Sequence, residues 1–141
     1  MLRYRSYTIA LVVMLGGLSP AQAEDTVLTL ACQGTATNHD YGGATGEGEP
    51  EPYSMRIVID FTAQTVEGFR PIRAKIRTVT NAIVAFEGSE DGNLITHTIS
   101  GLINLVIGDV QATLAFRDKD TGTVRAGIIY ALKCRPTQRM F

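Results

Sequence analysis

Alternation of apolar and polar positions is the strongest pattern in this chain. Over residues 53–60, 110–117 and 124–134, every second side chain is apolar. Alternate side chains of a β-strand point to opposite faces, so each of these segments predicts a strand with one face in a core. No segment keeps the i, i+3, i+4 apolar spacing of an amphipathic helix over three turns.

Weaker alternation predicts further strands at 26–32, 64–69, 72–80, 82–87, 94–100 and 102–107. The glycine-containing segments Ser89–Asn93 and Asp118–Gly122 are typical of hairpin turns. Short strands at this spacing favour an antiparallel barrel or a sandwich. We therefore predict an all-β fold, an antiparallel meander of about eight strands closed as a small barrel or sandwich.

Residues 33–52 interrupt the alternation. Their sequence, QGTATNHDYGGATGEGEPEP, is rich in glycine, proline and glutamate and poor in large apolar residues. Such a composition cannot bury enough apolar area to order itself. Long segments without secondary structure inside a small domain are uncommon, and they are usually functional or disordered. The sequence therefore predicts a flexible loop at 33–52.

The N-terminal segment has the three parts of a secretory signal peptide. Two arginines lie near its start, Ile9–Leu18 is apolar, and Ala21–Ala23 is a small-x-small end. The apolar run is shorter than the roughly 20 residues that a membrane-spanning helix needs. We predict a signal peptide at 1–23 and no transmembrane anchor, which leaves 24–141 as one β domain.

Two cysteines remain in that domain, Cys32 and Cys134. An even number of cysteines in an exported chain favours a disulfide. Each cysteine is the last of the alternating apolar positions in its segment, Leu28–Cys32 or Tyr130–Cys134. Both are therefore expected to point into the core. If the two strands were antiparallel neighbours they would overlap little, which favours parallel strands or facing sheets. Barrel and sandwich both remain open.

Composition narrows the class of protein further. Removal of the predicted leader takes away its two arginines, so 13 − 2 = 11 basic residues remain. With 14 acidic residues, the net charge becomes 11 − 14 = −3. A nucleic-acid-binding protein normally has a basic excess, so that class is disfavoured. The remaining 141 − 23 = 118 residues suit one ordinary domain and exclude a multidomain enzyme.

Cations gather on one expected strand. Arg73, Lys75 and Arg77 share one face of it, Arg70 stands just before it, and apolar residues take the other face. Such a row fits an anionic partner, for example a polysaccharide, a lipid headgroup or an acidic protein. Alternatively, the cations protect an exposed edge strand from pairing with other chains. A third possibility is an internal pairing with the glutamates of 47–51.

Catalytic and metal-binding motifs are absent from the sequence. His39 lies in the expected loop, and His97 alternates with Ile95 and Ile99, which favours a hydrogen-bonded structural histidine. An ordinary hairpin explains Asp118–Gly122 better than a calcium loop, because the later ligands of such a loop are missing. We expect no catalytic residue, no cofactor and no metal.

Three segments and the leader carry a resemblance. The segments are Leu30–Cys32, Phe116–Gly122 and Tyr130–Pro136, which supply an early Leu-Ala-Cys and a late Tyr-x-Leu-x-Cys-x-Pro. With these features the chain resembles small exported proteobacterial proteins of unknown function, over about half of the mature domain. The shared motifs are structural, so the resemblance implies no activity and no site residue.

These observations predict a periplasmic or secreted β domain that binds a partner rather than catalysing a reaction. The leading hypothesis is an envelope-associated binding module that uses Arg70, Arg73, Lys75 and Arg77. The partner is then an anionic envelope component or another protein, and not a nucleic acid. One alternative is a carrier that holds a small ligand in a barrel cavity. Another is a small periplasmic hydrolase that uses His39 or His97, which would need an acid or nucleophile within hydrogen-bond reach.

Overall fold

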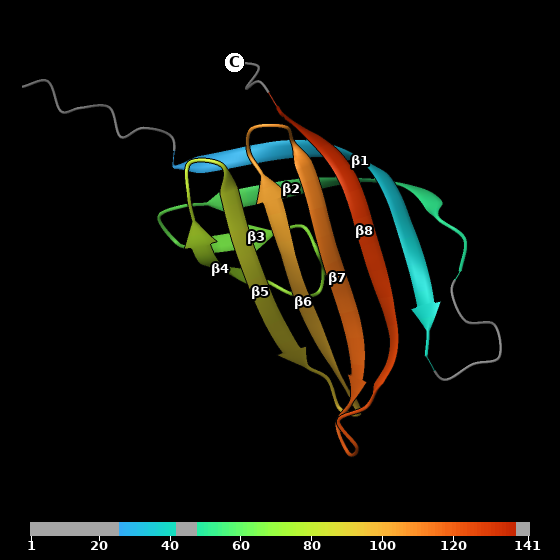
Figure 1. Cartoon of the computed structure of the whole chain (residues 1–141). Coiled ribbons are helices and arrows are strands. Elements are labelled where there is room, and N and C mark those ends of the chain that lie inside the picture. The colour runs from blue at the N-terminus through green and yellow to red at the C-terminus, as the bar shows by residue number, and fades with distance from the viewer. Residues whose placement is uncertain (1–25, 42–47, 138–141) are drawn as a thin grey trace, which may run out of the picture.

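The computed structural model describes residues 26–41 and 48–137, and these form eight antiparallel strands without a helix. The strands are β1 (Val27–Asp40), β2 (Glu51–Asp60), β3 (Thr65–Glu67), β4 (Ala74–Val79), β5 (Ile83–Asp91), β6 (Ile95–Asn104), β7 (Asp109–Asp118) and β8 (Val124–Pro136). Each strand pairs with the next, and β8 returns to β1 (Figure 1). The predicted all-β meander is confirmed, and of the two architectures it is the closed barrel.

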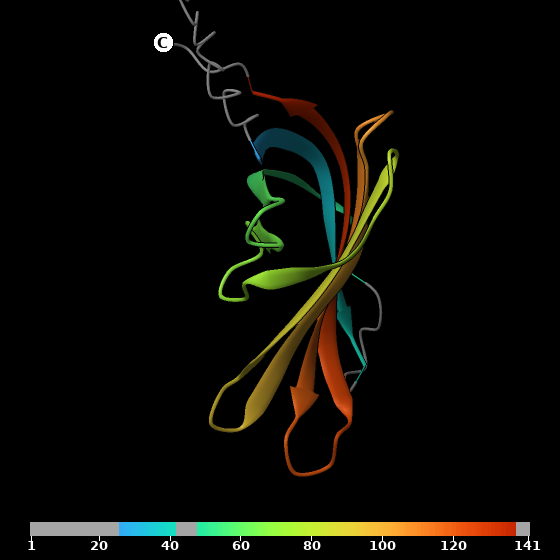
Figure 2. The same ribbon diagram turned by 90° about the vertical axis from the view of Figure 1, so that its left-hand side faces the viewer.

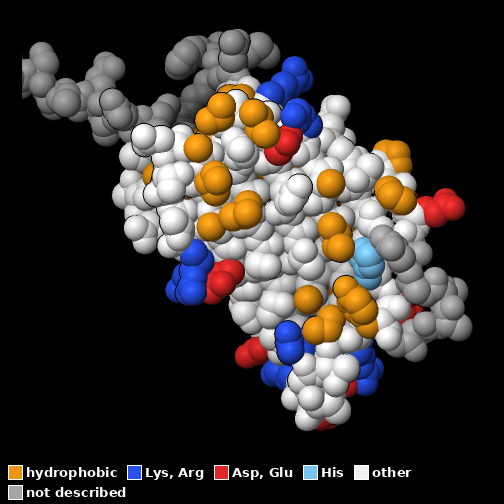
Figure 3. All heavy atoms as spheres, in the orientation of Figure 1, with side chains coloured by type: hydrophobic (Ala, Val, Ile, Leu, Met, Phe, Trp, Pro, Cys, Tyr) orange, Lys and Arg blue, Asp and Glu red, His pale blue; other side chains and the backbone are white. Residues whose placement is uncertain are grey.

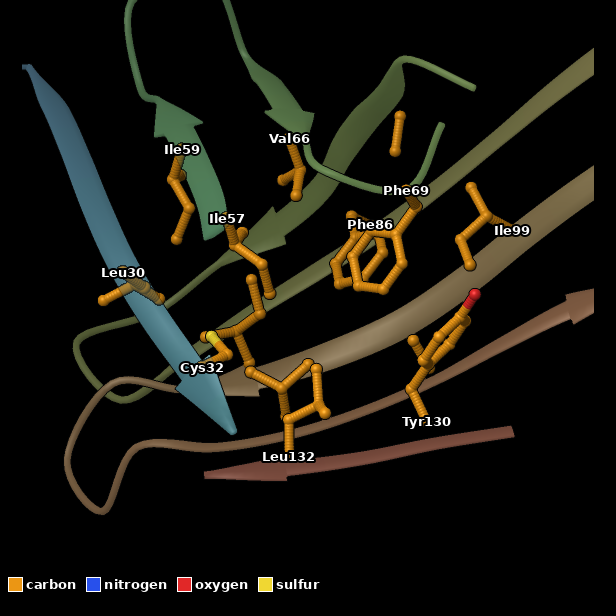
Figure 4. Packing of buried hydrophobic residues seen from close by; sticks show 14 of the residues in the cluster. Leu30, Cys32, Ile57, Ile59, Val66, Phe69, Phe86, Ile99, Tyr130 and Leu132 are labelled. Carbon is orange, nitrogen blue, oxygen red and sulfur yellow. The ribbon is translucent and has the colours of Figure 1, made fainter. Parts of the chain in front are cut away.

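Alternation explains the core. Inward-facing residues form the buried core, and Ile57 of β2, Val84 of β5 and Val110 of β7 have 0% exposure. Aromatic rings fill the middle: Phe69 lies 5.4 Å from Phe86 and 5.4 Å from Tyr130, measured between ring centroids (Figure 4). An eight-stranded barrel is just wide enough for its interior side chains to fill it. Side chains therefore occupy the interior here.

The two strands expected at 94–100 and 102–107 are one strand, β6 (Ile95–Asn104), and residues 105–107 form a turn. The pairing of β6 with β5 and β7 continues through Gly101. A Cβ atom at Gly101 would lie 2.5 Å from the Phe86 ring, so glycine leaves room for that ring inside the barrel.

The predicted loop at 33–52 is wrong over its first eight residues, because β1 continues to Asp40. These residues bury little apolar area, but they face the long strand β8, with pairs from Gln33↔Lys133 to Asp40↔Ala126. Hydrogen bonding to this neighbour satisfies their backbone groups, which composition alone cannot reveal. At the other end of the predicted loop, β2 begins at Glu51. Residues 42–47 lie outside the described part of the chain.

The predicted disulfide joins Cys32 to Cys134, with their Cα atoms 4.0 Å apart. The two residues are direct register partners on β1 and β8, which are antiparallel neighbours. The expectation of parallel strands or facing sheets was therefore wrong. It assumed that β1 ends at Cys32, whereas the extension to Asp40 provides the missing overlap.

The barrel is uneven along its length. Strands β5 to β8 project beyond the short strands β3 and β4 as a curved sheet (Figure 2). The hairpins expected at Ser89–Asn93 and Asp118–Gly122 connect these long strands, β5 to β6 and β7 to β8. Among residues 26–41 and 48–137 no helix is long and apolar enough to cross a bilayer. The signal peptide predicted at 1–23 lies outside the described residues.

Candidate anion-binding groove

The row of cations lies on the outer face of β4. Ile72 and Ala74 point into the barrel, with exposures of 3% and 0%. Arg73 and Lys75, which alternate with them, are exposed. The alternation in this segment is therefore as predicted. However, β4 is hydrogen-bonded to β3 on one side and to β5 on the other. Lys75 has register partners on both sides, so it does not protect a free edge, but β4 beyond Lys75 has no register partner on its β3 side.

Neighbouring strands supply acidic partners for two of the cations. Arg73 Nε lies 2.9 Å from Glu67 Oε1 on β3, and Arg77 Nη1 lies 3.1 Å from Glu87 Oε1 on β5. Lys75 is the register partner of Glu87. All four charged groups in these two pairs are about half exposed or more, so each pair contributes little to stability and is easily exchanged for a ligand.

The internal partners proposed from the sequence, the glutamates of 47–51, do not supply these pairs. Glu51 pairs with Ala36 at the start of β2, and Glu47 lies outside the described residues. The reason is the strand order, because β4 lies between β3 and β5 and the acids nearest to it come from those strands. Figure 3 shows basic side chains beside an acidic one over β4.

Three of the four predicted residues line one hollow. Arg73, Lys75 and Arg77 face an open groove of about 760 Å³ on the outer surface of β4 to β7. Arg117 from β7 joins them, and Glu87 is the one acid in the lining, so the formal charge there is 4 − 1 = +3. The polar remainder consists of the hydroxyl residues Ser89, Thr98 and Ser100. We call these lining residues the outer groove.

The sequence did not single out Arg117. It stands about 40 residues after β4 and reaches the groove because β5 and β6 lie between β4 and β7. Its guanidinium donates a hydrogen bond to the Gly122 carbonyl oxygen at 2.8 Å, which holds it beside the β7–β8 turn. Alternation places Arg117 on the outer face of its strand, but only the strand order shows which other cations share that face.

Arg70 belongs to a different hollow. It precedes β4 in the connection from β3, next to Pro71, whose peptide bond is cis. The hollow there, of about 470 Å³, is lined by Arg56 and Arg73 in addition to Arg70. The four predicted anion-binding residues therefore do not form a single set. Arg70 lies in the hollow beside β2, Lys75 and Arg77 lie in the outer groove, and Arg73 lines both.

The two histidines do not form a catalytic pair. His97 is on the inner face of β6 with buried Ile99, and its ring packs edge-on against Phe116 with 5.1 Å between centroids. His39 is on the outer face of β1, with its ring stacked on Tyr41 at 6.1 Å. No cluster of three potential metal ligands occurs among residues 26–41 and 48–137.

The pKa of one tyrosine side chain is shifted. Burial, together with the neighbouring Tyr53, raises the pKa of Tyr130 from 10.0 to about 12. The cause is desolvation, since the charged phenolate is disfavoured among the apolar rings at the centre of the barrel. Tyr130 therefore stays neutral at physiological pH and contributes as a core side chain.

Comparison with known proteins does not identify a relative. No family model matches the chain, and no curated protein or solved structure matches it significantly.

Proposed function

We propose that this chain is an exported, non-enzymatic binding module that holds an anionic envelope polysaccharide in the outer groove. The observation that carries the proposal is the lining of that groove, where four cations and one acid surround a row of hydroxyl side chains. Cations attract an anionic polymer, and hydroxyl groups exchange hydrogen bonds with its sugar units.

The filled barrel supports binding on the outside. A small-ligand carrier needs a cavity, but the inward side chains of this barrel pack against one another, with the rings of Phe69, Phe86 and Tyr130 in mutual contact. The outer groove, in contrast, is open along the sheet. An extended chain fits such a surface better than a compact small molecule does.

The lining also favours a glycan over a lipid or an apolar protein surface. The aliphatic residues among the lining are Ile76 and Ile99, and both pack into the core of the barrel. The groove therefore offers no exposed apolar side chain to an acyl chain. Binding rests on exposed charges, so it should weaken as salt rises.

Retention on immobilised polygalacturonate, a carboxylated polysaccharide, tests the proposal. Lys75→Gln with Arg117→Gln should elute at clearly lower salt than the parent protein. The matched control is Lys119→Gln with Lys133→Gln, which removes the same charge outside the groove and should elute like the parent. Equal effects of the two double variants would mean attraction by net charge alone, and the outer groove would be rejected.

Export is tested separately. We expect the protein recovered from the periplasm or the medium to begin at Glu24, as N-terminal sequencing can determine. A mature protein that still begins at Met1 would remove the exported location from the proposal.

A further inference from the structure

A second cationic hollow lies on the seam where the barrel closes. Ala31 of β1 is the register partner of Arg56 on β2 and also of Arg135 on β8. Its neighbours Leu30 and Cys32 are buried at 5% and 2%, so Ala31 points outward and the two arginines flank it on the outer surface. Figure 1 shows β1 between β2 and β8.

Register fixes how far apart these arginines are. Adjacent strands are about 4.8 Å apart, so the backbones of Arg56 and Arg135 are separated by roughly 10 Å. The methyl group of Ala31 leaves the space between them open, and the two long side chains can meet above it. Two residues further along β1, Gln33 is the register partner of both Ser54 and Lys133.

Together these residues line a hollow of about 690 Å³, whose lining also includes Cys32 and Cys134. The polar side chains around it belong to Gln33, Ser54, Arg56, Lys133, Arg135 and Thr137, so three of them are cationic and none is acidic. We call these lining residues the seam hollow. In Figure 3, basic side chains gather near the C-terminal end of β8.

The cations of the seam hollow outnumber the acids close to them. Carboxylates pair with Arg73, Arg77 and Arg125, and Lys133 Nζ lies 2.6 Å from Asp109 Oδ1 at the margin of the hollow. Neither Arg56 nor Arg135 has an acidic partner among the described residues. Like charges that face one hollow repel one another, and a bound anion converts that repulsion into attraction.

We infer that the seam hollow is a binding site for a phosphoryl group, either free phosphate or the phosphate of an envelope lipid. A planar carboxylate has two oxygens, whereas a tetrahedral phosphate has oxygens on several sides and can accept from two arginines approaching from different directions. Gln33 and its register partner Ser54 add neutral donors. The seam hollow shares no residue with the outer groove, so this inference stands independently of the proposed function.

The experiment has two arms, both on the disulfide-bonded protein at fixed ionic strength. In the first, inorganic phosphate is titrated while the backbone amide signals of Ala31 and Gln33 are followed by NMR. In the second, binding to phosphatidylglycerol vesicles is compared with binding to phosphatidylcholine vesicles. We expect saturable shifts centred on Ala31, selective binding to the anionic vesicles, or both.

Arg56→Gln with Arg135→Gln should weaken whichever response occurs at least tenfold. The control variant, Lys119→Gln with Arg125→Gln, removes the same charge outside both the seam hollow and the outer groove and should bind like the parent. Spectra that show an intact β-barrel and an oxidised disulfide exclude misfolding as the cause. The inference is overturned if neither arm gives a response, if the Arg56 and Arg135 variant binds like the parent, or if the control loses as much affinity.

Discussion

The two sides of the barrel are built differently. On the seam, β1 pairs with β8 continuously from Leu30 to Asp40, and a disulfide joins the two strands. On the other side, β3 has three residues and pairs with β4 through Thr65↔Lys75 and Val66↔Ala74 alone. The seam is held by backbone pairing and a covalent bond, whereas the β3–β4 side relies on buried side chains.

Ion pairs also differ between the two sides. Arg73 and Arg77 beside β3 and β4 pair with carboxylates on neighbouring strands, whereas Arg56 and Arg135 on the seam have no acidic partner among the described residues. A strongly tied seam tolerates unbalanced charge, while a weakly paired strand gains from every cross-strand pair. We assign the single phosphoryl group to the seam because two arginines flank Ala31 there, and the polymer to the outer groove because that groove is open along the sheet.

The largest expected effect comes from breaking the covalent tie of the seam. Cys32→Ser with Cys134→Ser opens a loop whose ends are separated by 102 residues. The chain-entropy account gives a loss of roughly 4–5 kcal/mol in the free energy of unfolding. Denaturant titration of the parent and the double variant measures it. A loss below about 1 kcal/mol would show that the long pairing of β1 with β8 closes the barrel by itself.

The second largest effect is expected on the β3–β4 side, which has no disulfide. Phe69 lies two residues after the end of β3, is 3% exposed and contacts the rings of both Phe86 and Tyr130. Phe69→Ala should lower the free energy of unfolding by roughly 3–5 kcal/mol, because it leaves a cavity at the centre of the core. Hydrogen exchange should show β3 and β4 losing protection more than β1 and β8. Uniform loss across all strands would contradict the division into two sides.

The free energy of unfolding at alkaline pH tests the packing between the two sides of the barrel. Tyr130 is on the seam strand β8, but its ring packs against Phe69, and its pKa is raised to about 12. The folded protein keeps a proton that the unfolded chain loses near pH 10. The stabilisation is therefore complete below pH 10 and falls by about 2–3 kcal/mol as the pH rises to 12.

Denaturant titration across pH 9 to 12 measures this fall. In Tyr130→Phe the decline over the same range should be distinctly shallower, because the buried phenol is gone while its ring remains. An unchanged decline in that variant would assign the effect to other groups.

The smallest effect is expected from the ion pairs of the β3–β4 side. Arg73 and Glu67 have side-chain exposures of 72% and 49%. A double-mutant cycle with Arg73→Ala and Glu67→Ala should give a coupling energy of about 0.2–1 kcal/mol that decreases with added salt. A coupling well above that range would mean that charge, and not the core, holds β3 to β4.

Much of the fold was predictable because its signals are local. Alternation located the long strands 53–60, 110–117 and 124–134 and showed which side chains point inward. The loop predicted at 33–52 failed where a polar segment is held in β1 by a partner strand. For the outer groove, the sequence supplied Arg73, Lys75 and Arg77 but not Arg117, which depends on the order of strands.

The sequence by itself therefore determined the β class, the inward and outward faces of most strands, and the pairing of Cys32 with Cys134. The β class and the faces follow from the alternation of side chains within each strand. The disulfide follows from the presence of two cysteines. The tertiary structure alone decided that β1 meets β8, that the architecture is a barrel, and that Arg56 and Arg135 flank Ala31. The physical reason is that alternation is a property of a single strand, whereas register and neighbours are set when the whole sheet closes.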